Sequence, residues 1–140
     1  MKNKYPNNKF LIFLINQIKK SIDRLNIKHH SLKPKFTSKS KFKLDPVTPL
    51  DKRIEKLVRK IISSNFPGHS IKGEEFKSRL KKSEYTWVID PLDGTKNYIL
   101  GIPTWSNLIG LQKKENSILS FANFPILKKY YLSLGKNSFI

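Results

Sequence analysis

Carboxylates are scarce in this chain, and half of them stand where structural elements are expected to end. Ten Asp and Glu residues accompany 28 Lys and Arg, and there is no Cys. Five of the ten acids lie beside turn residues rather than along a solvated helix face: Asp51, Glu74, Glu75, Asp90 and Asp93. Carboxylate oxygens gathered without thiolates suit a hard divalent cation such as Mg²⁺. The sequence therefore predicts an oxygen-ligated metal site.

Residues 90–95, Asp-Pro-Leu-Asp-Gly-Thr, have the chemistry for the centre of such a site. The preceding residues 86–89 are typical of a buried strand, which would deliver Asp90 at its end. Pro91 lacks an N–H and is expected to stop the strand ladder, and Asp93 would bring a second carboxylate to the same opening. A simpler alternative remains from composition alone, in which Asp93-Gly94 is a hairpin turn and Asp90 is a cap.

The rest of this segment could hold an anion. Leu92 can turn its side chain inward and leave its carbonyl facing the metal. Gly94 permits a close approach or a positive φ. Thr95 is expected to cap a short helix whose first N–H groups point at the anion. Metal ligands beside an anion-binding turn would hold a cation against a phosphate group.

Three motifs in one order resemble the inositol monophosphatase family. Residues 87–111 are similar to the family signature, including a Gly-x-Pro step at residues 101–103. Residues 47–51, Val-Thr-Pro-Leu-Asp, resemble its Val-Thr-x-x-Asp segment. Residues 66–75 resemble its strand into Gly-Glu-Glu. The resemblance covers about residues 43 to 134 of a chain that we treat as one domain, 1–140.

The resemblance implies a role for each motif residue. Mg²⁺ would be bound by Glu74, Asp90 and Asp93 through their side chains and by Leu92 through its carbonyl. The catalytic residues would be Thr95, Asp51 and Glu74, with Thr95 orienting the attacking water and Asp51 as its hydrogen-bond partner. The substrate phosphate would be held by Gly94 and Thr95. For Glu75, a structural salt bridge and a site role are left as equal alternatives, and Asp51 could also be a capping acid.

The reaction implied by the resemblance is hydrolysis of a phosphate monoester by metal-activated water, without a covalent phosphoenzyme. The substrate would be a small phosphorylated alcohol, either inositol monophosphate or histidinol phosphate. Residues 103–111 look somewhat more like the histidinol-phosphatase branch. The sequence has neither a Cys nor a Ser-His-Asp arrangement that would supply a protein nucleophile.

Two departures from the family matter. The Trp-Asp-x-Ala-Ala segment, which supplies a further metal-ligating Asp, is not found in residues 1–140. We therefore expect the C-terminal half to be missing, and we keep as an alternative a catalytically incomplete fragment or subunit that binds Mg²⁺ and phosphate without turnover. Residues 43–46 also stand where the family usually has a longer, flexible metal-binding loop.

Two helices are the first of the elements, in chain order, that must position these residues. Apolar residues at helical spacing predict a first helix over residues 10–25. Residues 28–43 are polar and are expected to form an exposed loop or weak hairpin, with His29 and His30 solvated rather than metal-bound. A second helix should begin with Thr48 as its cap and Asp51 closing a capping box, and should end near Asn65.

Strands follow the helices. They are expected from residue 70 into Gly-Glu-Glu, at residues 86–89, and at residues 104–111, 117–124 and 129–134. Tyr98 and Trp105 are expected in the core rather than in the site. Helices before strands predict an α+β or layered α/β class, which the resemblance specifies as the N-terminal half of an αβαβα sandwich with a mainly antiparallel sheet.

The net charge of +18 raises the question of nucleic acid. The basic residues are 24 Lys and only 4 Arg, scattered along the chain without a stripe that follows one face, so we expect no specific nucleic-acid partner. The apolar run at residues 10–15 is too short to span a bilayer. We expect no membrane partner and a cytoplasmic protein, with a homodimer or the missing half as further partners.

Overall fold

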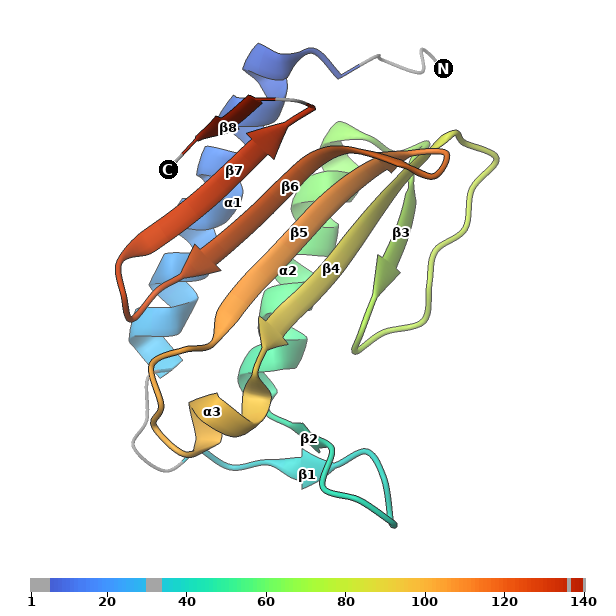
Figure 1. Ribbon diagram of the computed structural model, residues 1–140. Coiled ribbons are helices and arrows are strands. Elements are labelled where there is room, and N and C mark those ends of the chain that lie inside the picture. The colour runs from blue at the N-terminus through green and yellow to red at the C-terminus, as the bar shows by residue number, and fades with distance from the viewer. Residues whose placement is uncertain (1–5, 30–33, 136, 140) are drawn as a thin grey trace.

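The computed structural model describes residues 6–29, 34–135 and 137–139, which form one layer of helices against one sheet (Figure 1). The helices are α1 (Asn8–His29), α2 (Pro49–Asn65) and α3 (Thr95–Ile99). The strands are β1 (Thr37–Ser38), β2 (Pro46–Val47), β3 (Ser70–Gly73), β4 (Tyr85–Asp93), β5 (Ser106–Lys113), β6 (Asn116–Phe124), β7 (Lys129–Leu134) and β8 (Asn137–Phe139). The predicted α+β class, with two N-terminal helices and a mainly antiparallel sheet, is confirmed.

The large sheet has the order β3-β4-β5-β6-β7-β8. β3 runs parallel to β4, and each later pair is antiparallel. The parallel pair makes β3 and β4 end at the same edge of the sheet. The predicted strands are present, and β8 is an additional one that the sequence pattern did not indicate.

α2 begins as its sequence predicts, whereas α1 is longer than the predicted 10–25, since it begins at Asn8 and ends at His29, within the segment expected as a loop. In α2, the Thr48 side chain accepts from the backbone N–H of Asp51, while the Asp51 carboxylate accepts from the Thr48 N–H, so the capping box is complete. The helix ends at Asn65. In α1, Asn7 Oδ1 accepts a hydrogen bond from the Phe10 N–H at 2.8 Å. The buried stripe of α1 consists of Leu11, Leu14, Ile15, Ile18 and Ile22.

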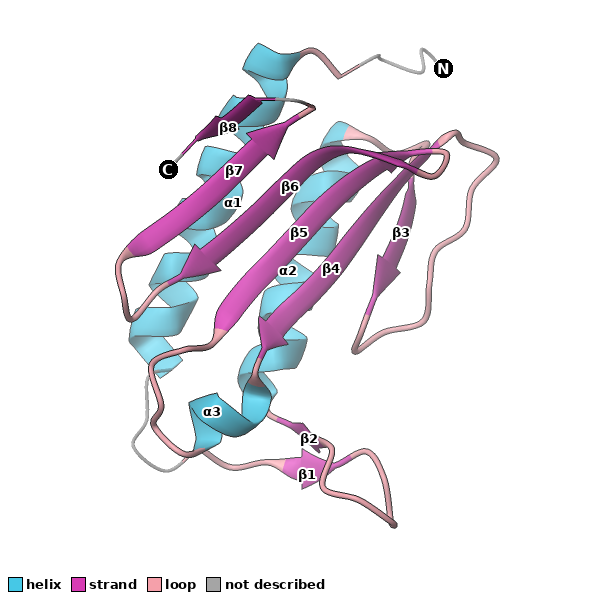
Figure 2. Ribbon diagram, viewed as in Figure 1, coloured by secondary structure: helices cyan, strands magenta, loops and turns pink. Residues whose placement is uncertain are grey.

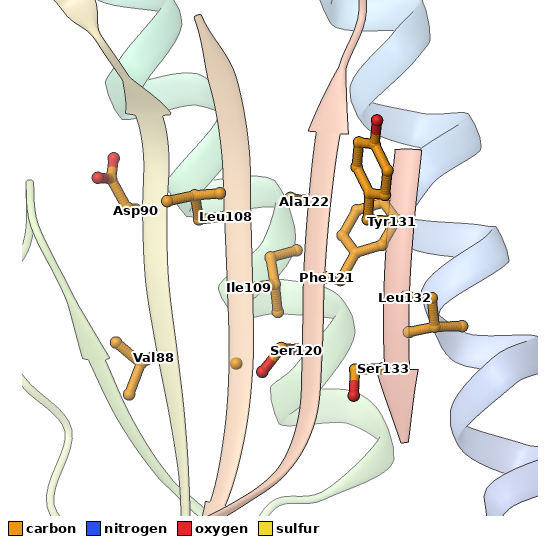
Figure 3. Close-up of a pocket in the computed structure, with 11 residues that line it drawn as sticks. Val88, Asp90, Leu108, Ile109, Ser120, Phe121, Ala122, Tyr131, Leu132 and Ser133 are labelled. Atoms are coloured by element: carbon orange, nitrogen blue, oxygen red, sulfur yellow. The ribbon is translucent and has the colours of Figure 1, made fainter. Parts of the chain in front are cut away.

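Among the described residues, helices cover one face of the sheet and leave the other without a helix (Figure 2). Trp87, Ile109 and Leu111 point toward α1 and α2 and are at most 2% exposed. On the opposite face, Val88 is 38% and Tyr131 is 44% exposed. A shallow hollow of about 600 Å³ lies over β4, β5, β6 and β7 on that side, and Asp90 stands at its edge (Figure 3). The sheet thus has an apolar face that the described residues leave open.

A short hairpin precedes α2, but only its first strand lies within residues 28–43, where a loop or weak hairpin was expected, and its second strand is at residues 46–47. β1 pairs with β2 through Thr37↔Val47 and Ser38↔Pro46. The tip of the hairpin carries Phe42, which is 99% exposed. The expectation for His29 and His30 concerns side chains outside the described part of the chain.

The distribution of charge differs from the sequence expectation. A groove between α1 and α2, on the helices' outer side, is lined by five cationic side chains: Arg24, Lys28, Arg53, Lys56 and Lys60. Five of the 28 basic residues therefore gather at this groove, because the exposed sides of two separate helices meet there. None of the helices in residues 6–29, 34–135 and 137–139 combines the length and apolar content that a membrane span requires.

Candidate active site

The predicted site residues converge at one edge of the sheet. β3 and β4 end there, α2 begins there, and α3 and the β1–β2 hairpin lie beside them (Figure 1). This edge therefore brings together Glu74 after β3, residues 90–93 at the end of β4, Asp51 in the first turn of α2 and Thr95 at the start of α3. Residues far apart in sequence meet because a parallel strand pair and a helix start share this edge.

A bulge shapes the end of β4. Asp90 pairs with Leu108, and the next pairing joins Asp93 to Ser106. Two residues of β4, Pro91 and Leu92, thus stand opposite the single residue Asn107 of β5. The expectation that Pro91 ends the ladder is wrong, because the strand continues to Asp93. A bulge tolerates a residue without an N–H, since the extra residue is left out of the ladder.

Thr95 does not cap α3, contrary to the prediction. The cap residue is Gly94, whose φ of 81° and ψ of 40° place it in the left-handed region, which glycine adopts at little cost. Thr95 is the first helical residue, and its hydroxyl points back over the bulge. Its Oγ1 lies 2.9 Å from the Leu92 carbonyl oxygen and 3.2 Å from Asp51 Oδ1. The hydroxyl therefore joins the start of α2 to the bulge of β4.

Asp51 makes both of the contacts that its two expected roles require, one in the capping box and one with Thr95. Its Oδ2 accepts the Thr48 N–H at 2.8 Å in the capping box, and its Oδ1 faces the Thr95 hydroxyl. The residue is 1% exposed. Burial raises the pKa of Asp51, although the hydrogen bonds from Thr48 and Thr95 act in the opposite direction. The carboxylate is thus fixed at both oxygens.

Two neighbouring carboxylates, those of Glu74 and Asp93, act on the carboxyl of Asp90 at the site. Burial, followed by the hydrogen bond and charge of Glu74 and the charge of Asp93, raises the pKa of Asp90 to about 7. Such crowding of like charges disfavours ionisation unless a cation is present. Oxygen donors alone are the ligands that Mg²⁺ prefers. The chemistry of these donors therefore suits a hard divalent cation.

A lysine that sequence reasoning missed lies at these carboxylates. Lys39 of the β1–β2 hairpin places its Nζ 2.9 Å from Glu74 Oε1 and 2.6 Å from Glu75 Oε1. Although burial acts to lower it, hydrogen bonds to Glu75 and Glu74 raise the pKa of Lys39. Among the described residues, no three carboxylate or imidazole side chains are close enough to enclose one metal ion. The cation beside Glu74 in this arrangement is Lys39.

For Glu75, the alternatives were a structural salt bridge and a role in the site, and the structure shows the salt bridge. Its side chain is 3% exposed and ion-paired with Lys39, as the structural reading requires. Its backbone N–H donates to Glu55 Oε2 at 2.6 Å. Glu75 is therefore part of the scaffold of the Glu74 turn, and a site role beyond that stays a prediction.

Glu55 is a second residue that sequence reasoning missed. It is fully buried and accepts hydrogen bonds from Arg59 Nε at 2.7 Å and from the Phe76 N–H at 3.2 Å, in addition to that of Glu75. Glu55 thus holds the turn that presents Glu74. An acid within the buried face of α2, directly after Ile54, was the signal that could have found it.

Tyr98 and Trp105 belong to the core, as predicted. Their ring centroids are 5.2 Å apart in an edge-to-face arrangement, and both residues are buried. They pack the short α3 against the start of β5. Aromatic pairs of this geometry add stabilisation beyond the burial of their area. The Tyr98–Trp105 pair therefore helps to hold α3, and with it Thr95, in position.

Comparison with known proteins gives consistent matches. The profile of the Inositol monophosphatase family matches residues 9–140, which extends the resemblance to the first helix. The chain is 40% identical over 103 residues to the bifunctional phosphatase IMPL2, chloroplastic, of Arabidopsis thaliana, covering 72% of this chain and 30% of that protein. It is 33% identical over 97 residues to the histidinol-phosphatase of Mycobacterium tuberculosis, covering 69% of this chain and 37% of that protein.

The fold is similar to that of a solved IMPase/NADP phosphatase complexed with Mg²⁺ and phosphate. The TM-score is 0.82 at 23% identity, over 94% of this chain and 50% of that chain. The match thus spans about a third of the two curated relatives and half of the solved chain.

Proposed function

Because the chain belongs to the inositol monophosphatase family, we propose that it provides the metal and phosphate site of a Mg²⁺-dependent phosphate monoester hydrolase. The observation that carries this proposal is the convergence of Glu74, Asp90 and Asp93 beside a threonine hydroxyl held by Asp51 and Leu92. These groups come from four separate elements. A shared functional site explains why they lie together better than a contribution to the stability of the fold does. Like charges brought together destabilise a fold unless a cation offsets them.

The proposed metal ligands are the carboxylates of Glu74, Asp90 and Asp93 and the carbonyl of Leu92. Bound Mg²⁺ would lower the pKa of an attacking water and offset charge on the leaving oxygen. Asp90 is already oriented, because its Oδ1 accepts the Leu92 N–H at 3.2 Å. Asp93 Oδ2 is held by the Ser106 hydroxyl at 3.4 Å. The carboxylates of Asp90 and Asp93 are thus each held by a hydrogen bond before a metal binds.

The chain's own residues would orient the water and the phosphate. The Thr95 hydroxyl proton is directed at the Leu92 carbonyl or Asp51 Oδ1, so an Oγ1 lone pair is left to accept a hydrogen bond from the attacking water. Asp51, whose pKa is raised by burial, can take up the Thr95 proton as that water loses its own. The Gly94 and Thr95 N–H groups would hold the phosphate.

For the substrate we propose a small phosphorylated alcohol, either histidinol phosphate or inositol monophosphate. The relatives support both, since one is a histidinol-phosphatase and the family is named for inositol monophosphate. The alcohol would lie outward from the phosphate, over the open side of the site. Asp90 lines the hollow on that side.

For the partner we propose a further segment of the family fold, on this polypeptide or another, that covers the open sheet face. Support comes from the exposed apolar residues of that face and from the solved relative, which extends over about twice as much chain. A second copy of this chain is the other occupant that we retain. We retain the cytoplasm as the proposed compartment, which suits a cysteine-free chain.

A second candidate function is binding of Mg²⁺ and phosphate without turnover. It is favoured by one observation, that no three acidic or imidazole side chains among the described residues already enclose an ion. Both candidates require the same first step, which is metal-dependent binding of phosphate. They differ in whether hydrolysis follows.

Calorimetric titration of inorganic phosphate tests that shared step. We expect binding in the presence of Mg²⁺ and none in EDTA, and we expect Glu74→Gln to abolish it. Glu84→Gln is the matched control, because Glu84 is an exposed acid before β4, paired with Lys114 away from the site. Equal phosphate binding with Mg²⁺ and with EDTA would contradict the proposed function.

A further inference from the structure

Three buried asparagines lie directly beneath the β4 bulge. Asn107 and Asn123 are each 1% exposed, and Asn26 is 6% exposed. They come from β5, β6 and α1 respectively, and α1 lies behind the sheet in Figure 1. The next helix-facing residues along β5, Ile109 and Leu111, are apolar. A polar cluster therefore interrupts an apolar layer at the one place where β4 leaves regular pairing with β5.

The asparagines form one connected network that ends on the bulge. Asn107 Nδ2 donates to the Pro91 carbonyl oxygen at 2.8 Å. Asn107 Oδ1 accepts from Asn123 Nδ2 at 3.1 Å and from Asn26 Nδ2 at 3.3 Å. Asn123 Nδ2 also donates to Asp23 Oδ1 at 2.9 Å. The orientation of the Asn107 amide is thus fixed from two sides.

The bulge explains why an amide is needed here. Two residues of β4 face one residue of β5, so the strand ladder leaves a backbone group unpaired. The Pro91 carbonyl, in the part of β4 that is out of register, accepts its hydrogen bond from the Asn107 side chain, which is 1% exposed. A buried carbonyl requires a donor, and the Asn107 side chain takes the place of the missing ladder N–H.

We propose that Asn107, held by Asn26 and Asn123, is a positioning residue for the metal site. This inference rests on the proposed function. By holding the Pro91 carbonyl inward, Asn107 fixes the peptide plane between Pro91 and Leu92. That plane carries the Leu92 N–H, which binds Asp90 Oδ1, and it sets the direction of the following Leu92 carbonyl.

The network also gives α1 a part in the site. Asp23 and Asn26 belong to this helix, which carries none of the three family motifs. Through Asn123 and Asn107 they connect the helix to the residues between the two carboxylates of the bulge. Partners beyond the metal ligands commonly orient those ligands, and their loss typically weakens metal affinity by about 10–100-fold.

The test compares Asn107→Leu with Ile109→Ala. Ile109 lies two residues along the same strand and faces the same core, so its variant loses buried contacts without touching the bulge. Asn107→Leu should weaken Mg²⁺ binding by about tenfold or more in calorimetry, whereas Ile109→Ala should stay within about twofold of the parent because its lost contacts lie outside the ligand set. Asn123→Ala removes a hydrogen bond that supports Asn107 but leaves the Pro91 carbonyl its donor, so it should show a smaller loss of Mg²⁺ affinity. It is the variant to use if Asn107→Leu does not fold.

Amide chemical shifts of Leu92, Asp93 and Gly94 in the metal-free protein give a readout that is independent of Mg²⁺. We expect large changes in Asn107→Leu and none in Ile109→Ala. Unchanged shifts, or unchanged Mg²⁺ affinity in Asn107→Leu, would overturn the positioning role. If the parent chain itself fails to bind Mg²⁺, the proposed function fails, and the shifts alone decide whether Asn107 fixes the bulge.

Discussion

Thr95 Oγ1 lies 3.2 Å from Asp51 Oδ1, although the two residues are 44 positions apart in the sequence. The contact joins the first turn of α2 to the first residue of α3, across the end of β4. Each partner is also held elsewhere, Thr95 by the Leu92 carbonyl and Asp51 by the Thr48 N–H. The Thr95 hydroxyl oxygen is therefore held between two separate elements, as the proposed water-orienting role requires.

Thr95→Ala should lower turnover strongly in the complete enzyme, in which the further segment is supplied. Loss of a positioned group that handles the water proton typically costs about 10²–10⁴-fold, and we expect about a hundredfold. Phosphate binding should persist, because the N–H groups remain. Steady-state kinetics of phosphate release measures this, and Thr95→Ser, which keeps the hydroxyl, is the matched control. Turnover at the parent level in Thr95→Ala would reduce Thr95 to a structural link.

Mg²⁺ should raise the melting temperature of the parent chain and leave that of Asp90→Asn unchanged. A ligand that binds only the folded state at a hundred times its Kd stabilises by about 2.7 kcal/mol. In the absence of metal, Asp90→Asn should be no less stable than the parent, since it relieves crowding by Glu74 and Asp93. Differential scanning fluorimetry with and without Mg²⁺ measures both effects. Glu84→Gln should behave like the parent, and an equal shift in Asp90→Asn would falsify its assignment as a ligand.

Local sequence patterns predicted most of the fold. The capping box of α2 depends on Thr48 and Asp51, three residues apart, and the strands depend on short runs of apolar and β-branched residues. The end of β4 was predicted less well. Which residue resumes the ladder after Pro91 depends on its pairing with β5, and no local pattern in either strand records that register.

The sequence motifs named the acidic residues that meet at the candidate site but not the residues that support them. Asp90 and Asp93 stand in a recognisable motif, whereas Lys39 is one lysine among 24 and its contact with Glu74 spans 35 positions. Asn107 gave no signal, because its partners Asn26 and Asn123 come from separate elements. Supporting residues act through tertiary contacts, and a single sequence does not show which side chains meet.

His69 should make stability depend on pH below neutrality. The imidazole is stacked between Phe66 and Tyr85, and its Nδ1 accepts the Trp87 Nε1–H at 3.2 Å. Burial, together with the charge of Arg79, lowers the pKa of His69 from 6.5 to about 4. The folded state thus favours the neutral ring. The contribution of His69 to the free energy of unfolding is therefore fully present above pH 6.5 and is lost as the pH decreases from 6.5 to about 4.

Urea unfolding at several pH values measures this dependence. The slope from His69 should approach about 1.4 kcal/mol per pH unit within that window, and His69→Gln should remove it. Because the carboxyls of Asp51, Glu75 and Asp90 also titrate abnormally, the difference between parent and variant is the quantity to compare. Parallel curves for the two proteins would contradict the assignment.

Gly73→Ala should destabilise the chain and disturb the Glu74 turn. A Cβ at this position would lie 2.0 Å from Glu55 Oε1, and the Glu55 carboxylate is fully buried. The carboxylate would have to move away from the N–H groups of Glu75 and Phe76, which it binds. We expect a loss of about 1–3 kcal/mol, typical of overpacking, measured by chemical denaturation. Gly110→Ala is the control, since its Cβ would meet only the Leu119 carbonyl, at 3.7 Å, and a similar loss in both variants would argue against a special role for Glu55.

By itself, this 140-residue polypeptide should be a poor phosphatase. Asp90 stands at the edge of an open hollow (Figure 3), and the described carboxylates do not yet enclose an ion. Positioning of reactants can supply about 7–11 kcal/mol of a barrier, so an unfinished pocket should cost orders of magnitude in rate. The exposed apolar face should also make the polypeptide self-associate as its concentration rises.

The assay uses histidinol phosphate and inositol monophosphate with Mg²⁺, first with the polypeptide alone and then with a separately expressed C-terminal half from a related family member. Turnover should appear on mixing, and light scattering should show that self-association decreases at the same time, because the added half covers the hollow. The same mixture made with Asp90→Asn should stay inactive, which excludes activity from the added half. Turnover by the lone polypeptide at the level of an intact family member would mean that the groups at the β3–β4 edge suffice, and the proposed covering segment would then have no catalytic part.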